Sequence, residues 1–357
     1  MKKYAIIGLL VLIIGAFVVV PLFQSSGDDE MAFADFERNE DIQTTFGATI
    51  PLTLVVPEGL EKVELIYNDS IFKTWEQPTA KINFVLDASY FGVGTRIVVI
   101  RSYLSNGTTQ DASHMIRVVS DIAPTPMLVK VTKEYPHDTQ NYTQGLEFNN
   151  GKLYEGTGDP SQQGKTVVGQ VDLKTGRFSG LKNGLDHTYF GEGITIFGNE
   201  LFQLTWKNGK CFVYDKNTMQ LKRDISYSGD GWGLCNDGKA LIMSDGTERI
   251  YFRNPKTFQI IRTIDVYDNV GPRTFINELE FVNGKIYANI YQTNTIIAID
   301  PLTGKVLEEI DASALEISGK SGGDVLNGIA FNPLTNKTYL TGKYWSKLFE
   351  VQFIPIQ

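Results

Sequence analysis

The sequence is poor in the side chains that most often bind transition metals, with two cysteines and three histidines among its 357 residues. This scarcity argues against a metal centre built from histidine or cysteine, but it does not exclude a structural calcium ion held by oxygen ligands. We therefore expect no cofactor and no metal in the functional site. Cys211 and Cys235 could form a disulfide in an oxidising compartment, but two buried free thiols are the favoured interpretation because free cysteine is commonly buried.

Blocks of positive charge are also missing, and the formal net charge of the chain is −8. Proteins that bind nucleic acid usually carry a basic patch, so nucleic acid is not an expected partner. The chain is long enough for two or three domains, and its 42% hydrophobic content is that of a globular protein. The sequence does not indicate an oligomeric state.

One long apolar run is present, from Ala5 to Phe23, directly after Lys2 and Lys3. Its length is close to the roughly 20 residues of a membrane-spanning helix and exceeds the roughly 7–15 residues of a signal-peptide core. We expect residues 1–23 to form an apolar helix that anchors the protein in a membrane, with a cleaved signal peptide as the alternative. The lysines orient the rest of the chain away from the cytoplasm, and residues 24–35 are expected to be a spacer.

The next part of the chain, residues 36–122, is predicted to be a small β-sandwich of the immunoglobulin-like kind and of unknown role. Short strand-like segments follow one another at close intervals and are separated by turn residues, a pattern typical of a sandwich. They are residues 50–57, 62–68, 81–87, 95–103 and 114–121. The proline-containing segment Ala123–Met127 then predicts a linker.

The remaining residues, 123–357, repeat one pattern five times: a polar residue, a strand, a turn and a second strand. The copies are QGLEFNNGKLY, EGITIFGNELF, WGLCNDGKALI, NELEFVNGKIY and NGIAFNPLTNKTYL. Their first residues lie 40 to 50 positions apart and are Gln144, Glu192, Trp232, Asn277 and Asn327. Repeats of this length with several strands each are typical of a β-propeller. The sequence therefore predicts an all-β protein with a five-bladed propeller, whose last blade is completed by residues 128–135.

The repeat alignment also predicts a site. The first strand of each propeller blade lines the central channel, so the five leading residues should form a ring at one mouth. The second strand runs antiparallel and ends at the same mouth. The residues expected beside the ring are Trp206, Asp245, Tyr291 and Lys343, and those expected to wall the approach are Tyr142 and Phe190.

Glu192 is the carboxylate of this ring and has a glycine on each side. The glycines are expected to let a substrate approach closely. Burial among aromatic rings would raise the pKa of Glu192, whereas Lys343 would lower it, and this balance suits a group that transfers protons near neutral pH. The amides of Asn277 and Gln144 can bind a carbonyl or an amine, and aromatic walls attract an ammonium group.

At these residues the chain resembles the glutamine cyclotransferases of plants and bacteria, which are five-bladed propeller glutaminyl cyclases. The resemblance extends from about Glu134 to Val351. It is carried by YPHDTQNYTQGLEF, LYEGTG, FGEGITIFGNELFQLTWKNG, GDGWGLCNDG, INELEFVNGKIYANIYQTN, DVLNGIAFN and LTGKYWSKLFEV.

The resemblance implies an enzyme that converts the N-terminal glutamine of peptides or proteins to pyroglutamate and releases ammonia. It implies that Glu192 is the general acid and base, and that Asn277 and Lys343 stabilise the amide and its developing oxyanion. The expected substrate-binding residues are Gln144, Tyr142, Phe190, Trp206, Trp232, Tyr291 and Asn327. Tyr142 replaces a common Phe, and Tyr291 replaces the usual Trp, which would alter substrate preference or weaken turnover.

Three other interpretations of the ring stay open at this point. The leading alternative is a non-catalytic propeller that binds a peptide end or another small ligand without turnover. Less favoured are an ion-dependent hydrolase such as a lactonase, and a glycosidase-type carboxylate pair made by Glu192 and Asp245. An ammonia-release measurement on Gln-initiated peptides separates these from a cyclotransferase.

Overall fold

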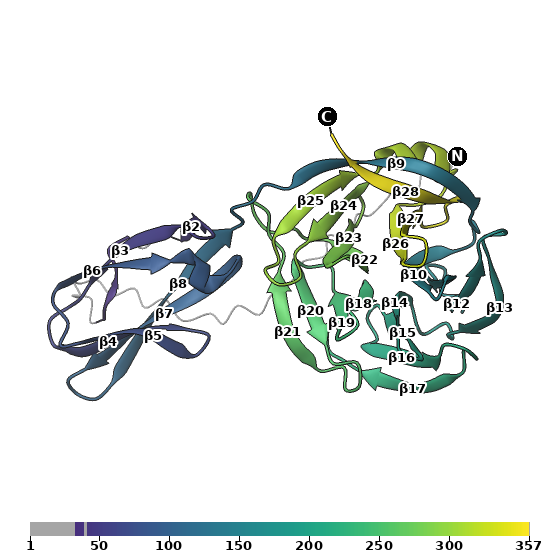
Figure 1. The fold of residues 1–357 in the computed structure, drawn as a ribbon. Coiled ribbons are helices and arrows are strands. Elements are labelled where there is room, and N and C mark those ends of the chain that lie inside the picture. Colours follow the sequence, from purple (N-terminus) through teal and green to yellow (C-terminus); the bar gives the residue numbers. More distant parts are fainter. Residues whose placement is uncertain (1–32, 39–40, 357) are drawn as a thin grey trace, which may run out of the picture.

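The computed structural model describes residues 33–38 and 41–356, which form an all-β protein (Figure 1). These residues contain 28 strands, a short α-helix Ser313–Gly319 (α1) and a 3-10 turn Ala88–Phe91 (η1). Within these residues no helix is long and apolar enough to cross a membrane. The predicted apolar helix 1–23 and residues 24–32 of the predicted spacer lie outside the described residues.

Two sheets pack face to face in the N-terminal part. One sheet has the order β1-β3-β6 and the other β2-β8-β7-β4-β5. The strands are β1 (Asp35–Phe36), β2 (Ile42–Thr45), β3 (Thr49–Val55), β4 (Leu60–Tyr67), β5 (Ser70–Glu76), β6 (Lys81–Asp87), β7 (Gly94–Leu104) and β8 (Thr109–Val119). Alternating apolar residues of both sheets, such as Leu54, Leu65 and Ile100, share one buried core.

Each of the five predicted segments in this region is a strand, but the pattern missed β1, β2 and β5. Strand β5 pairs with β4 through the two-residue loop Asn68–Asp69, whose φ angles of 48° and 57° are those of a type I′ hairpin turn. The predicted spacer also ends too late. Ala34 is fully buried in the core, and its N–H donates to Ser102 Oγ at 2.8 Å.

The C-terminal part forms five blades arranged around a central axis, as in a β-propeller (Figure 1): three blades are separate four-stranded sheets, and the other two belong to one continuous eight-stranded sheet. The first three sheets are β10 (Tyr142–Asn149) to β13 (Arg177–Gly184), β14 (Gly191–Phe197) to β17 (Leu221–Ser226) and β18 (Leu234–Asn236) to β21 (Ile260–Asp265). The fourth blade runs from β22 (Ile276–Val282) to β25 (Val306–Asp311), and the fifth contains β26 (Leu326–Asn332), β27 (Lys337–Gly342) and β28 (Lys347–Pro355). The strands between them are β11 (Lys152–Gly158), β12 (Val167–Asp172), β15 (Glu200–Thr205), β16 (Lys210–Asp215), β19 (Leu241–Ser244), β20 (Arg249–Arg253), β23 (Lys285–Ile290) and β24 (Thr295–Ile299).

Strand β9 (Thr125–Pro136) closes the propeller. It pairs antiparallel with β28 from Met127 to Pro136 and so completes the fifth blade, which confirms the predicted closure. Its first residues also pair in parallel with β25 of the fourth blade. The proline-containing segment therefore belongs largely to a strand and is not a free linker.

The two cysteines lie in the propeller core as free thiols. Cys211 is on β16 and Cys235 on β18, and both are buried. Burial raises the pKa of both thiols far above the ordinary range. The structure thus supports the favoured interpretation of two buried apolar side chains over a disulfide.

The sandwich lies against the side of the propeller, beside β21 and β25 (Figure 1). The guanidinium of Arg96 binds the Asp265 carboxylate, and Lys305 Nζ lies 2.7 Å from Asp121 Oδ1. Around these ion pairs, Tyr267 packs on Val93 and Val119 of the sandwich. No residue of the sandwich lines the cavity described below.

Three buried carboxyl groups connect the inner strands of different blades. Glu278 accepts N–H bonds from Leu146 at 3.1 Å and from Ile329 at 2.8 Å. Glu147 accepts from the Ile196 N–H at 2.9 Å, and Glu280 accepts from the Phe331 N–H at 2.7 Å. Burial raises the pKa of all three, to about 7 for Glu147 and well above the ordinary value for the other two.

From the raised pKa values of these carboxyl groups, we expect the protein to lose stability as the pH rises from about 4.5 to 7. In this interval the folded state binds more protons than the unfolded state, because its pKa values are the higher ones. Each group contributes a loss of about 1.4 kcal/mol per pH unit within its own interval. Urea unfolding at pH 5, 6 and 7 measures how the free energy of unfolding changes with pH. Glu147→Gln keeps a carbonyl that accepts from the Ile196 N–H, and it should make this change smaller. A free energy of unfolding that increases over this interval would contradict the assignment.

Candidate active site

The ring residues are set by irregularities in the inner strands. The pairing of β10 with β11 shifts between Thr143 and Gly145, and the corresponding shift in the second blade lies between Gly191 and Ile194. The fourth and fifth blades have the same shift at their ring positions. A β-bulge adds a residue to one strand and re-aims its side chain. The bulges therefore occur at Gln144, Glu192, Asn277 and Asn327, while Trp232 lies two positions before the start of β18.

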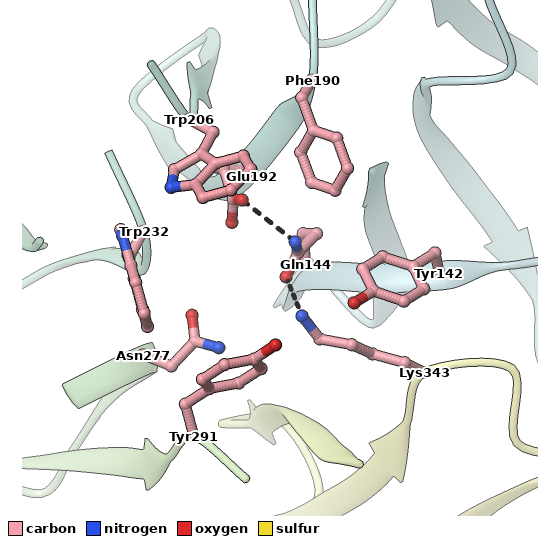
Figure 2. Close-up of a pocket in the computed structure, with 9 residues that line it drawn as sticks. All are labelled: Tyr142, Gln144, Phe190, Glu192, Trp206, Trp232, Asn277, Tyr291 and Lys343. Carbon is pink, nitrogen blue, oxygen red and sulfur yellow. Dashed lines mark hydrogen bonds between the residues drawn. The ribbon is translucent and has the colours of Figure 1, made fainter. Parts of the chain in front are cut away.

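A cavity of about 90 Å³ opens at this mouth of the channel (Figure 2). Its lining residues are Tyr142, Gln144, Phe190, Glu192, Trp206, Trp232, Asn277, Tyr291 and Lys343. The structure thus brings together nine of the ten residues predicted to act on or bind the substrate; the tenth is Asn327. Typical ligand pockets are roughly 300–1,000 Å³, so this cavity fits one amino-acid side chain better than a coenzyme.

The glycines beside Glu192 serve chain packing, which corrects the expectation that they admit substrate. A Cβ on Gly193 would lie 2.4 Å from the Leu234 nitrogen and 2.6 Å from the Trp232 oxygen. A Cβ on Gly191 would lie 2.7 Å from the Thr157 oxygen. Gly191 therefore packs against the second strand of the preceding blade and Gly193 against the start of the following blade, and neither position has room for a side chain.

Gln144 is hydrogen-bonded to both titratable side chains of the cavity, Glu192 and Lys343. Its Nε2 donates to Glu192 Oε1 at 3.0 Å, and its Oε1 accepts from Lys343 Nζ at 2.7 Å (Figure 2). Asn327 lies behind this amide and donates to Gln144 Oε1 at 3.3 Å and to the Thr143 carbonyl at 2.9 Å. Asn327 therefore supports Gln144 and does not line the cavity, which differs from its predicted role.

Burial shifts the pKa values of Glu192 and Lys343 in opposite directions. Glu192 is 5% exposed, and its burial raises its pKa well above the ordinary value, although Lys343 lowers it. Lys343 is 2% exposed, and its burial lowers its pKa to about 8, although Glu192 and Asp324 raise it. Both groups can therefore exchange protons closer to neutral pH than ordinary side chains of their kind.

Aromatic rings surround the two charged groups. Lys343 Nζ lies 4.4 Å from the ring centre of Tyr142 and 5.2 Å from that of Tyr291, so both rings support its charge. Phe190 contacts Trp206 edge to face, and Trp232 contacts Tyr291 in the same way. These walls exclude water and leave a face on which an ammonium group can bind.

Asn277 offers a free acceptor to a ligand. In Figure 2 its amide points between Trp232 and Tyr291 toward the centre of the cavity. Its Oδ1 is buried and has no hydrogen-bond partner in the described part of the chain. A buried acceptor without a partner is costly, so a ligand with an N–H donor at this position would be stabilised.

Asp245 was expected at the mouth but does not line the cavity. Its carboxylate accepts from the Thr247 N–H at 3.0 Å and from the Tyr251 hydroxyl at 2.9 Å. It is therefore not available to form a glycosidase-type pair with Glu192. Among residues 33–38 and 41–356, no group of three or more His, Cys, Asp or Glu is arranged to hold a metal ion.

Phe275 was not among the predicted residues, but its backbone is bonded to Tyr291 of the cavity lining. Phe275 is two positions before Asn277, as Tyr142 and Phe190 are two positions before their ring residues, so the repeat alignment could have found it. Its side chain is 55% exposed, and its φ of 60° is unusual for a bulky residue. Its N–H donates to the Gly246 carbonyl at 2.8 Å and its carbonyl accepts from the Tyr291 N–H at 2.9 Å.

These features define a class of β-propeller in which a small aromatic cavity at the channel mouth holds a carboxyl and an amine of shifted pKa. The comparisons with known proteins give the family. The family model for glutamine cyclotransferase matches residues 99–353. A glutaminyl-peptide cyclotransferase from Arabidopsis thaliana is 39% identical over 254 residues, which are 70% of this chain and 75% of that protein.

A solved structure agrees with this match. The crystal structure of Myxococcus xanthus glutaminyl cyclase superposes with a TM-score of 0.61 and 37% sequence identity, covering 66% of this chain and 100% of that one. The chain belongs to the glutamine cyclotransferase family. About a third of this chain lies outside the part that the bacterial structure covers.

Proposed function

We propose that the protein is a glutaminyl-peptide cyclotransferase, which converts the N-terminal glutamine of a peptide or protein to pyroglutamate and releases ammonia. The observation that carries this proposal is the buried Glu192, joined through Gln144 to Lys343 in a cavity sized for one side chain. Membership of the family supports the same activity.

The reaction needs a proton carrier and no protein nucleophile. The α-amine of the substrate attacks the carbon of its own side-chain amide, and Glu192 takes the proton that the amine gives up. When the C–N bond of the amide breaks, Glu192 returns that proton to the leaving nitrogen, which departs as ammonia. Its raised pKa suits both steps, because a general acid and base works best near the pH at which it operates.

The other cavity residues hold and polarise the substrate. The free Oδ1 of Asn277 accepts an N–H of the substrate, and Lys343 stabilises the negative charge that develops on the amide oxygen. The aromatic walls confine the glutamine side chain to a conformation close to ring closure, which supplies much of the rate. Phe190, Trp206, Trp232, Tyr142 and Tyr291 form these walls.

A panel of three peptides tests this chemistry. A Gln-initiated peptide should release ammonia, whereas the same peptide with an acetylated α-amine should not, because its nitrogen no longer attacks. An Asn-initiated peptide should also be unreactive, since ring closure would give a strained four-membered ring. Ammonia from the acetylated peptide would indicate simple amide hydrolysis and would overturn the proposal.

We further propose that the enzyme acts outside the cytoplasm, held in the membrane by residues 1–23, with an immunoglobulin-like sandwich between the membrane and the propeller. The support is the apolar run from Ala5 to Phe23 behind Lys2 and Lys3. Cell fractionation of the full chain and of a chain starting at residue 24 tests this. The full chain should be found with membranes, and recovery of both forms in the same soluble fraction would contradict the anchor.

Tyr291 should adjust substrate affinity rather than the chemical step. Its ring packs on Trp232 at 5.5 Å and faces the Lys343 ammonium. We expect Tyr291→Trp to lower KM about two- to fivefold with little change in kcat, because a Trp face attracts cations more strongly and buries more area. Tyr291→Phe removes the hydroxyl alone and serves as the control. A large loss of kcat in Tyr291→Phe would show instead that the hydroxyl takes part in the reaction.

A further inference from the structure

A second buried acid lies directly behind the cavity. Glu155 on β11 is fully buried, and its carboxylate accepts hydrogen bonds from Asn141 Nδ2 at 2.8 Å and from Thr143 Oγ1 at 2.8 Å, while His137 Nε2 lies 3.1 Å from its Oε1. These three partners lie at the start of the segment that carries Tyr142 and Gln144. Glu155 thus connects the second strand of the first blade with the entrance to its first strand.

His137 faces acceptors on both sides of its ring. Its Nδ1 lies 2.8 Å from the Trp345 carbonyl oxygen, and its Nε2 lies 3.1 Å from the Glu155 carboxylate. A neutral imidazole has one N–H, so it could donate to one of these groups and not to the other. Both bonds exist together when the ring is an imidazolium ion.

The same segment holds the loop that carries Lys343. Besides the bond from His137 to Trp345, the Tyr344 N–H donates to the Asn141 carbonyl at 2.8 Å. The backbone N–H of His137 donates to the Ser346 carbonyl at 3.0 Å. Residues 344–346 are therefore fixed to His137 and Asn141, and both of these are bound to Glu155. Lys343 is the first residue of this loop.

We propose that His137 and Glu155 form a buried imidazolium–carboxylate pair that positions Lys343 against Gln144 in the catalytic cavity. An isolated buried charge is very costly, but a pair with further hydrogen bonds to the carboxylate is stable. The pair touches neither the cavity nor the substrate, so both members are positioning residues. This proposal rests on the role given to Lys343 above.

The charges around the pair agree with this assignment. Burial lowers the pKa of His137, but Glu155, the Trp345 carbonyl and Asp138 raise it, and the pKa is above the ordinary value as a result. On the other side of the loop, Lys343 faces Glu192, Asp324, Tyr142 and Tyr291.

Nitrogen NMR of the histidine side chains tests the pair without turnover. The chain has three histidines, so the signals of His137 are separated from those of His114 and His187 by two single substitutions. We expect both ring nitrogens of His137 to be protonated at pH 7 and above. A single protonated nitrogen at pH 7 would overturn the proposal, whatever the enzyme does with its substrate.

Kinetics tests the positioning role. Glu155→Gln should lower kcat/KM about 10–100-fold, as loss of a supporting residue typically does. It should also move the alkaline limb of the pH–rate profile from about 8 toward the ordinary pKa of lysine, because a loosened loop exposes Lys343 to water. A loss of folded protein alone would reduce the activity and leave this limb in place, and that outcome would contradict the proposal.

Two further variants keep the test decisive. Asp35→Asn makes the same chemical change in the other buried carboxylate–histidine pair, Asp35 with His114 of the sandwich, and should leave the profile unchanged. Thr143→Val removes one hydrogen bond to Glu155 and keeps the side-chain shape. If Glu155→Gln does not fold, Thr143→Val should still move the limb in the same direction by a smaller amount, and an unmoved limb would count against the pair.

Discussion

Replacing Glu192 with Gln should abolish the release of ammonia from a Gln-initiated peptide while the protein keeps its fold. The amide can still accept the hydrogen bond from Gln144, but it cannot take a proton from the substrate amine or return one to the leaving nitrogen. Loss of a general acid–base group costs about 10²–10⁴-fold in kcat. Steady-state ammonia release and circular dichroism of the same preparation measure the two parts of this prediction.

Asp245→Asn is the matched control for this change. Asp245 lies at the same mouth of the channel, but its carboxylate bonds to Thr247 and Tyr251 and does not line the cavity. Its replacement should therefore leave kcat close to that of the wild type. Equal losses in both variants would mean that negative charge at the mouth matters, and not the proton carried by Glu192.

Replacing Lys343 with Met should lower kcat/KM about 100-fold, which is typical for loss of a group that stabilises a developing oxyanion. The change should also move the acid limb of the pH–rate profile to higher pH. Lys343 lowers the pKa of Glu192, so its removal raises that pKa further, and Glu192 is then deprotonated only at a higher pH. The profile of kcat/KM from pH 5 to 9 measures both effects.

Lys347→Met controls for loss of a lysine from the same hairpin. Lys347 forms a surface ion pair with Glu134 at 2.7 Å and does not line the cavity, and exposed pairs contribute little to stability. Its profile should match that of the wild type. An acid limb that stays fixed in Lys343→Met would show that Lys343 does not set the protonation of Glu192.

The repeat alignment could predict the blades and most of the site because each blade folds alike. Once Glu192 is aligned with Gln144 and Asn277, the fold places all three at one mouth, and no long-range information is needed. The same alignment misplaced Asn327, since the sequence does not show that Gln144 lies between it and the cavity. It also did not show that Asp245 stays out of the cavity lining, because its carboxylate bonds locally to Thr247.

The network behind the cavity could not be predicted from the sequence. His137 and Glu155 are 18 residues apart, and the loop at Trp345 is 208 residues from His137. No periodic pattern relates such positions, because their contact depends on the first and last blades meeting at the closure strand. The glycines beside Glu192 were misinterpreted for a similar reason, since the crowding comes from another blade.

The stoichiometry of the reaction tests the central claim most directly. Purified protein is incubated with a Gln-initiated peptide, and ammonia and pyroglutamyl peptide are measured together over time. A glutaminyl-peptide cyclotransferase gives the two products in equal amounts, with neither formed by Glu192→Gln. A peptide that binds to the wild-type protein and is recovered unchanged would contradict this function and identify a propeller that only binds peptide ends.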